Sequence, residues 1–268
     1  MSIRKSYIDG PFGQIHLRTI GERGHGAAAK PDLICLHPAP FSGLAFTAIM
    51  PHLAKGRRVI APDFPGHGGS DPFRADASIA DYAAAMLTAA DMLSPGAPVD
   101  LFGFHSGGLV AVEMGIAAPA RINQLVLCDT PAFDAATRAG LLETNARAPG
   151  FTPDLNSLGE VWARGVERRV ESQGMARSLE MFTEQLRHGE AMNGGFHAAF
   201  SYDVERQLVR LTRPATMIAT RSGLLDATRR AASLIPDAAL VERLDVTRAV
   251  IDEAAETIAG EVLRALGD

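Results

Sequence analysis

Short apolar runs alternate with longer amphipathic segments over most of this chain. The runs predict buried β-strands at 33–36, 58–61, 99–104 and 122–128. Segment 79–93 has helical spacing instead, with Ile79, Tyr82, Ala83, Met86 and Ala90 on one face. Residues 3–20 predict an antiparallel pair around the turn at 9–13. Strands that alternate with helices predict a largely parallel sheet covered by helices on both faces.

The alternation stops after residue 132. From 133 to 207 the pattern is helical and no segment predicts a strand, as in the spacing of Leu179, Phe182 and Leu186. Predicted strands return at 215–219 and 239–244, with helices at 227–234 and 248–266. We therefore expect an α/β core made of 1–132 and 208–268, with a helical cap at 133–207 inserted into it.

Composition and charge narrow the class of protein. The chain has 268 residues, of which 47% are hydrophobic, enough for one α/β core with an insertion. The net charge of −5, without a basic run, argues against nucleic acid or an anionic membrane as partner. Neither a signal peptide nor an apolar stretch of about 20 residues is present, so we expect a cytoplasmic protein.

Cysteine and histidine spacing gives no sign of a metal or cofactor. Cys35 and Cys128 each lie in a predicted buried strand, so we expect free thiols in a reducing compartment. No C-x-x-C or H-E-x-x-H pattern occurs. We therefore predict no metal site and no cofactor.

The stretch LFGFHSGG at 101–108 joins a predicted strand to an Ala-rich helical segment. A sharp turn from strand to helix needs small residues, because one backbone position takes an unfavourable φ and the helix packs close to the strand. Gly103, Gly107 and Gly108 supply that freedom. We expect the chemistry of this protein at this turn.

The stretch resembles the nucleophile elbow of the α/β-hydrolase family, G-x-nucleophile-x-G. Aligned without gaps, Gly103 and Gly107 flank His105, where the family has Ser, Cys or Asp. The alternative register places Ser106 at the apex and Phe104 at a glycine position. We expect His105 at the apex with a positive φ.

Two further motifs carry the resemblance. LHPAP at 36–40 is similar to the strand and loop that supply half of the family's oxyanion hole. DFPGHGGSD at 63–71 is similar to the family motif D-x-P-G-x-G-x-S-D. The resemblance implies the α/β-hydrolase fold, a mostly parallel twisted sheet flanked by helices, with an inserted helical cap.

The resemblance also implies an oxyanion hole made of two backbone N–H groups. The matching positions are Ser106, which follows the apex, and Ala39 in the loop after 33–36. Pro38 stands where the family has Gly, and Pro40 has no N–H. The alternative is an inherited turn that binds a carbonyl or a water without catalysis.

The other two members of the family's catalytic triad are absent from their expected places. Gly223 occupies the acid position, and Asp226 could replace that acid only in a remodelled loop. No histidine follows His197, so the base position near Arg248 has none. A Ser–His–Asp triad in the usual arrangement is therefore excluded.

His105 itself can act as base, acid or nucleophile, since imidazole titrates near neutral pH. We expect Asp129, at the end of the neighbouring strand, to lie close to it and to raise its pKa. A turn or helix cap before Pro131 is the alternative role of Asp129. The predicted catalytic set is therefore His105, Asp129 and Ser106.

A small-molecule pocket is expected beneath the cap. The residues predicted to line it are His37, Phe41, Phe104, Trp162 and His197. His37 has the alternative role of bracing its loop, and His197 that of an exposed helix residue. Each aromatic residue taken singly is also compatible with ordinary core packing.

The resemblance and the altered apex together lead to one main hypothesis and two alternatives. The main one is an α/β-hydrolase-like enzyme acting on a small ester, amide or carbonyl compound, with His105 as base or nucleophile. The alternatives are a non-catalytic small-molecule-binding protein and a lyase or decarboxylase that uses His105 as general base. The expected partner is a small molecule, and the existence of a homodimer stays open.

Overall fold

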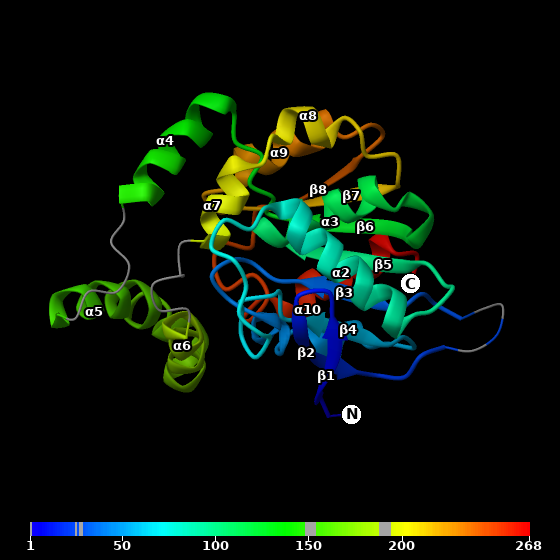
Figure 1. The fold of residues 1–268 in the computed structure, drawn as a ribbon, viewed down its shortest axis with the longest axis horizontal. Coiled ribbons are helices and arrows are strands. Elements are labelled where there is room, and N and C mark those ends of the chain that lie inside the picture. The colour runs from blue at the N-terminus through cyan, green and yellow to red at the C-terminus, as the bar shows by residue number, and fades with distance from the viewer. Residues whose placement is uncertain (1, 25, 27–28, 148–153, 188–193) are drawn as a thin grey trace.

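The structure, a computed structural model, describes residues 2–24, 26, 29–147, 154–187 and 194–268. One sheet organises it, with strand order β1-β2-β4-β3-β5-β6-β7-β8 (Figure 1). The strands are β1 Arg4–Gly10, β2 Gly13–Ile20, β3 Leu33–Leu36, β4 Val59–Pro62, β5 Val99–Phe104, β6 Ile122–Cys128, β7 Ala215–Thr220 and β8 Ala239–Arg243. β2 pairs antiparallel with β1 and β4, and every other pairing is parallel, as predicted.

The strand residues alternate between two hydrophobic cores, one on each face of the sheet. On β3, Ile34 and Leu36 belong to the first core, and Leu33 and Cys35 to the second. The first core is covered by α2 Ile79–Leu93, α3 Ser106–Ala117 and α9 Leu225–Leu234. The second is covered by the short helices η1 Gly43–Phe46 and α1 Met50–Leu53 and by α10 Ala255–Ala265. The sheet is therefore buried on both sides, as its continuous apolar runs require.

Between β6 and β7 the described chain is helical and contains no strand, in agreement with the predicted pattern. The helices are α4 Ala135–Arg147, α5 Leu155–Trp162, the π-helical turn η3 Ala163–Glu167, α6 Val170–Leu186, α7 Gly194–Ser201 and α8 Val204–Leu208. In Figure 1, α4, α5 and α6 stand out to one side of the sheet, whereas α7 and α8 lie against the helices that cover it. The division at 133 and 207 stays a prediction.

The C-terminal helix begins later than its spacing predicted. Residues 248–254 form turns instead of the first helical turns, and Ala249 takes a φ of 44°. α10 starts only at Ala255, while Val250 and Ile251 are buried in the second core. The loop after β8 therefore folds over the carboxyl edge of the sheet, where it joins the candidate site.

The two thiols are free and buried, as expected from their positions in the strands. Burial raises the pKa of Cys35 and, together with the nearby Asp129 charge, that of Cys128. Both side chains therefore act as small apolar residues of the core. None of the helices in the described ranges has the length and apolarity needed to cross a membrane.

Candidate active site

His105 forms the apex of the turn between β5 and α3. Its φ is 51° and its ψ is −123°, a conformation that costs energy for any residue with a Cβ atom. Hydrogen bonds hold it in place: the His105 N–H donates to Cys128 O at 3.0 Å, and Gly108 N–H donates to His105 O at 2.9 Å. The predicted register is confirmed, and the alternative with Ser106 at the apex is wrong.

Two glycines allow the helix to approach the sheet this closely. A Cβ atom at Gly107 would lie 2.0 Å from Leu36 O, and one at Gly103 would lie 2.6 Å from the Gly108 Cα. Both clashes are with backbone, which cannot rotate away. The elbow therefore depends on these glycines whatever side chain stands at position 105.

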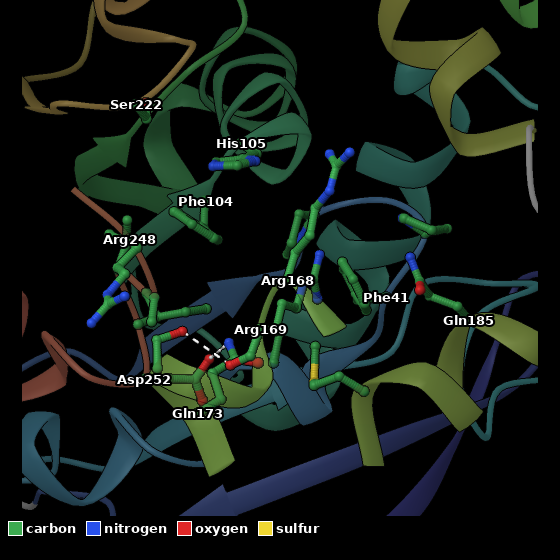
Figure 2. A pocket seen from close by; sticks show the side chains of 18 of the residues that line it. Phe41, Phe104, His105, Arg168, Arg169, Gln173, Gln185, Ser222, Arg248 and Asp252 are labelled. Carbon is green, nitrogen blue, oxygen red and sulfur yellow. Dashed lines mark hydrogen bonds between the residues drawn. The ribbon is translucent and has the colours of Figure 1, made fainter. Parts of the chain in front are cut away.

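A cavity of about 440 Å³ opens in front of the elbow (Figure 2). Its walls come from the loops after β3, β7 and β8, the elbow, the turn between η3 and α6, and the helices α6 and α7. Phe41, Phe104 and His105 line it, in agreement with the sequence analysis. The polar residues of its wall are Arg168, Arg169, Ser172, Gln173, Gln185, Ser222, Thr247, Arg248 and Asp252.

His105 is neutral at neutral pH in this site. Its ring lies against that of Phe104, with the centroids 4.1 Å apart. Burial lowers the pKa of His105 to about 4; the Asp129 charge opposes this shift and the Arg169 charge adds to it. The expected rise in the His105 pKa is therefore wrong, because loss of hydration outweighs attraction to one carboxylate.

Asp129 lies beside His105, as the strand order predicted. The register pairs Phe104 with Cys128, so the two residues follow neighbouring strand ends. Asp129 is fully buried, and its carboxylate accepts hydrogen bonds from the Thr220 N–H at 2.9 Å and the Thr220 hydroxyl at 2.6 Å. Its oxygens thus tie β6 to β7, and it acts on His105 through its charge.

The two predicted oxyanion donors are in different states. Ser106 is the first residue of α3, so its N–H has no partner within the helix. The Ala39 N–H donates to the Ser106 hydroxyl at 2.8 Å. The Ala39 N–H is therefore already used by the Ser106 hydroxyl, so the structure does not present two free N–H groups to an oxyanion.

His37 braces a loop and does not line the cavity. Its side chain is fully buried, its Nε2 accepts from the Phe64 N–H at 2.9 Å, and its Nδ1 lies 3.1 Å from Pro38 O. These bonds assign the neutral tautomer with the proton on Nδ1. The predicted pocket role of His37 is wrong, because both ring nitrogens form hydrogen bonds with backbone groups, Pro38 O and the Phe64 N–H.

Trp162 and His197 also lie away from the cavity wall. Trp162 packs edge-on against Phe182, 5.5 Å between ring centroids, in a separate small cluster with Val161 and Val166. His197 is exposed on α7, whose neighbouring Phe196 faces the cavity instead. Helical geometry turns adjacent side chains about 100° apart, so Phe196 and His197 point in different directions.

The loops that carry acid and base in the usual triad lack both here. Gly223 is exposed, and the Asp226 side chain, 95% exposed, pairs with Arg229 at 3.3 Å. At the base position, Thr247 and Arg248 line the cavity. Within the described ranges, no group of three or more His, Cys, Asp or Glu side chains is arranged to hold a metal ion.

Three arginines of the cavity wall were missed by the sequence analysis. Arg168 and Arg169 lie between η3 and α6, and Arg248 follows β8. Figure 2 shows them around the same cavity as His105. The available signals were the adjacent arginine pair and a cationic residue in the loop that lacks the usual histidine.

Comparisons with known proteins agree with this architecture. Residues 31–246 match the family model described as alpha/beta hydrolase fold. The chain is 28% identical over 245 residues to a pimeloyl-[acyl-carrier protein] methyl ester esterase of Pectobacterium carotovorum, covering 85% of this chain and 88% of that protein. It is 29% identical over 185 residues to a 2-hydroxymuconate semialdehyde hydrolase of a Pseudomonas strain, covering 66% and 60%.

A solved structure supports the same assignment at the level of the fold. A hydrolase from Pseudomonas aeruginosa superposes with a TM-score of 0.80 at 24% identity, covering 99% of each chain. The family match spans the elbow, both flanking loops and the helical segment between β6 and β7. The chain belongs to the α/β-hydrolase fold family.

Proposed function

We propose that this protein hydrolyses a small ester or a related activated carbonyl compound, with His105 as the reacting side chain. The observation that carries the proposal is the imidazole at the apex of the elbow, facing a cavity of small-molecule size. The family normally presents its nucleophile from this position. The neutral ring of His105 has a free lone pair and needs no second residue to deprotonate it.

Two routes are open to a neutral imidazole here. As a nucleophile, the His105 nitrogen bonds to the carbonyl carbon and expels the alcohol, and water then cleaves the acyl-imidazole. As a general base, it takes a proton from a water whose oxygen attacks the carbonyl, and returns that proton to the leaving alcohol. In both routes ester and water give acid and alcohol.

An oxyanion would form next to the start of α3. The Ser106 N–H is one donor for it, and the Ala39 N–H becomes the second when the Ser106 hydroxyl turns aside. We therefore assign Ser106 a backbone role and propose that its hydroxyl restrains the hole. The names of the two relatives, a methyl ester esterase and a semialdehyde hydrolase, support carbonyl hydrolysis as the reaction class.

A non-catalytic ligand-binding protein is the second candidate. The hydrogen bond between the Ala39 N–H and Ser106 favours it, because a bound carbonyl finds that donor already used. The missing acid and base favour it as well. A lyase that uses His105 as general base would share the site but release no alcohol.

Hydrolysis of a panel of small methyl and p-nitrophenyl esters tests the proposal. His105→Ala should lower kcat/KM by about 100-fold or more, as expected for loss of the group that attacks or moves the proton. His197→Ala, an exposed histidine off the cavity, is the matched control and should retain full activity. Equal rates in wild type and His105→Ala would refute the proposed role.

A second experiment separates His105 from Ser106. Fluorophosphonate probes should fail to label Ser106, since the loop that carries the family's base has no histidine in this sequence and the Ser106 hydroxyl is held by the Ala39 N–H. Ser106→Ala should preserve or raise esterase activity by freeing the Ala39 N–H. Loss of activity in Ser106→Ala, with stoichiometric labelling of wild type, would reassign the nucleophile to Ser106. A trapped acyl adduct on His105 would select the nucleophilic route.

A further inference from the structure

Arg169 is a half-buried cation on the cavity wall. Its guanidinium carbon lies 5.0 Å from the centre of the Phe41 ring, and burial lowers the pKa of Arg169. Among the residues that the structure describes, no carboxylate oxygen lies within 4 Å of its nitrogens. A guanidinium withdrawn from water without an anionic partner is costly, so this arrangement calls for an anion from outside the chain.

The nearest acidic side chain is already committed. Asp252 accepts from Arg177 Nε at 2.9 Å and from Gln173 Nε2 at 2.9 Å, one bond to each carboxylate oxygen. Arg177 donates further to Leu44 O and Ala45 O, both at 3.1 Å. Asp252 therefore belongs to a network that ties α6 to η1, and only its longer-range attraction reaches Arg169.

The rest of the cavity wall adds positive charge. Arg168 is adjacent to Arg169 and exposed, and it makes no ion pair with the other described side chains. Arg248 pairs with Glu171 and Glu253, both at 3.3 Å. Asp252 is the one acidic residue among the described residues of the wall, and Arg168 and Arg169 are its two arginines without an ion pair among the described side chains. The cavity therefore favours an anionic ligand.

We propose that Arg169, with Arg168 beside it, receives a carboxylate that the substrate carries close to its reacting carbonyl or ester group. The planar guanidinium matches a carboxylate with two parallel N–H···O bonds. This inference rests on the proposed function and narrows its substrate class to small carboxylate-bearing esters.

The same anion would change the chemistry of His105. In the empty site the Arg169 charge adds to burial in lowering the pKa of His105. A carboxylate on Arg169 offsets that charge and raises the pKa towards neutral pH, where a general base is most effective. The substrate thus supplies the charge that makes its own catalyst more basic, and a neutral ester of the same size does not.

Binding of succinate, measured by calorimetry, tests the subsite without any need for turnover. Wild type should bind succinate, and Arg169→Gln should bind it at least about tenfold more weakly. Succinamide, which has no carboxylate, should bind to neither protein. Arg164→Gln, an exposed arginine of η3 that lies off the cavity, is the matched control. Equal binding by wild type and Arg169→Gln, or none by wild type, overturns the subsite.

NMR titration of His105 supplies the second measurement. Succinate should raise the His105 pKa in wild type and leave it unchanged in Arg169→Gln. If Arg169→Gln fails to fold, Arg169→Lys and Arg168→Gln take its place, with weaker succinate binding expected in both. An unchanged His105 pKa in succinate-bound wild type contradicts the coupling of Arg169 to His105.

Two esters separate failure of the subsite from failure of the proposed function. Wild type should hydrolyse monomethyl succinate faster than methyl butyrate, and Arg169→Gln should abolish that preference. Succinate binding without hydrolysis of either ester would leave the subsite standing and refute the hydrolase. Equal hydrolysis of both esters by wild type and Arg169→Gln would support the hydrolase and refute the carboxylate subsite.

Discussion

Two charged side chains, Asp63 and Arg169, contact the chain that follows β3 but differ in the partners they have. Asp63, at the end of β4, is fully buried and has every neighbour it needs. It accepts from His16 Nδ1 at 2.8 Å, Arg18 at 2.7 Å, the Gly43 N–H at 2.8 Å and the Gly69 N–H at 2.9 Å. One carboxylate thereby joins β2 to the two loops that follow β3 and β4.

Arg169 is the contrasting case. It is half-buried, its guanidinium lies over the Phe41 ring, and no carboxylate oxygen of the described residues lies within 4 Å of its nitrogens. Removal of a buried charge whose partners all lie inside the chain destabilises the fold, because those partners are left unpaired, whereas a charge without such partners is available to a ligand. The number of partners inside the chain, and not the residue type, therefore distinguishes the role of Asp63 from that of Arg169.

Removal of the paired charge should have the largest effect. Asp63→Ala leaves Arg18 buried without its carboxylate and two backbone N–H groups without an acceptor, so the free energy of unfolding should fall by about 3–5 kcal/mol. Urea denaturation measures it, with Asp76→Ala, whose side chain is 86% exposed, as the control. A loss below about 1 kcal/mol would show that Asp63 contributes no more to the stability of the fold than is expected of Arg169.

The pH dependence of Asp63 has a defined sign. Burial alone would raise its pKa, but the His16 hydrogen bond and the Arg18 charge hold the pKa below its usual value. Its contribution to stability is therefore present above pH 4 and is lost as the pH falls through the folded pKa. Asp63→Ala should remove this part of the acid dependence.

His105 should produce the next largest effect, through pH. Its folded pKa of about 4 lies below the unfolded value of 6.5, so the unfolded chain binds the extra proton between these values. The free energy of unfolding should therefore fall as the pH drops from 6.5 to 4, by at most about 3 kcal/mol. Denaturation of wild type and His105→Gln across this range measures it, and parallel curves would show that His105 is well hydrated.

Asp129→Asn should cost about 1–3 kcal/mol, because the new amide cannot accept from both the Thr220 N–H and the Thr220 hydroxyl. The same change removes the negative charge that raises the His105 pKa, so that pKa should fall further. If His105 is catalytic, the loss of kcat/KM in Asp129→Asn, expressed as a free energy, should exceed the loss in the free energy of unfolding. An unchanged His105 pKa by NMR would remove Asp129 as its electrostatic partner.

The smallest effect on stability is expected at Arg169. Arg169→Met gives up the contact with Phe41 but also relieves the burial of an unpaired charge, so the free energy of unfolding should change by less than about 1 kcal/mol. Chemical denaturation beside Asp63→Ala makes the comparison direct. A loss near 3 kcal/mol would mean that Arg169 stabilises the fold as Asp63 does.

Most of the fold could be predicted from the chain because its signals are local. Apolar runs gave the strands, and the glycines around His105 gave the strained apex, since a Cβ at Gly107 would meet the backbone of Leu36. The late start of α10 could not be predicted, because its amphipathic spacing continues into 248–254 although that segment folds over the sheet edge. The turn with Ala249 at φ 44° has no glycine to mark it.

The site was less predictable because its contacts join distant parts of the chain. Phe41, Phe104 and Asp129 follow from strand order, and they lie where that order puts them. The hydrogen bond from the Ala39 N–H to the Ser106 hydroxyl depends on the Ser106 rotamer. His37 forms a hydrogen bond with the Phe64 N–H, which only the folded loop brings near. Arg169 carries no motif, and its significance lies in partners that the chain does not provide.

The elbow has a consequence for protein engineering. The Cys128 carbonyl accepts from the backbone N–H of residue 105, and the glycines at 103 and 107 leave room for neighbouring backbone, so both act on the main chain. The side chain of residue 105 can therefore be exchanged while the backbone keeps its shape. His105→Asp, His105→Cys or His105→Ser would therefore present a different reactive group to the same cationic cavity from the same backbone position.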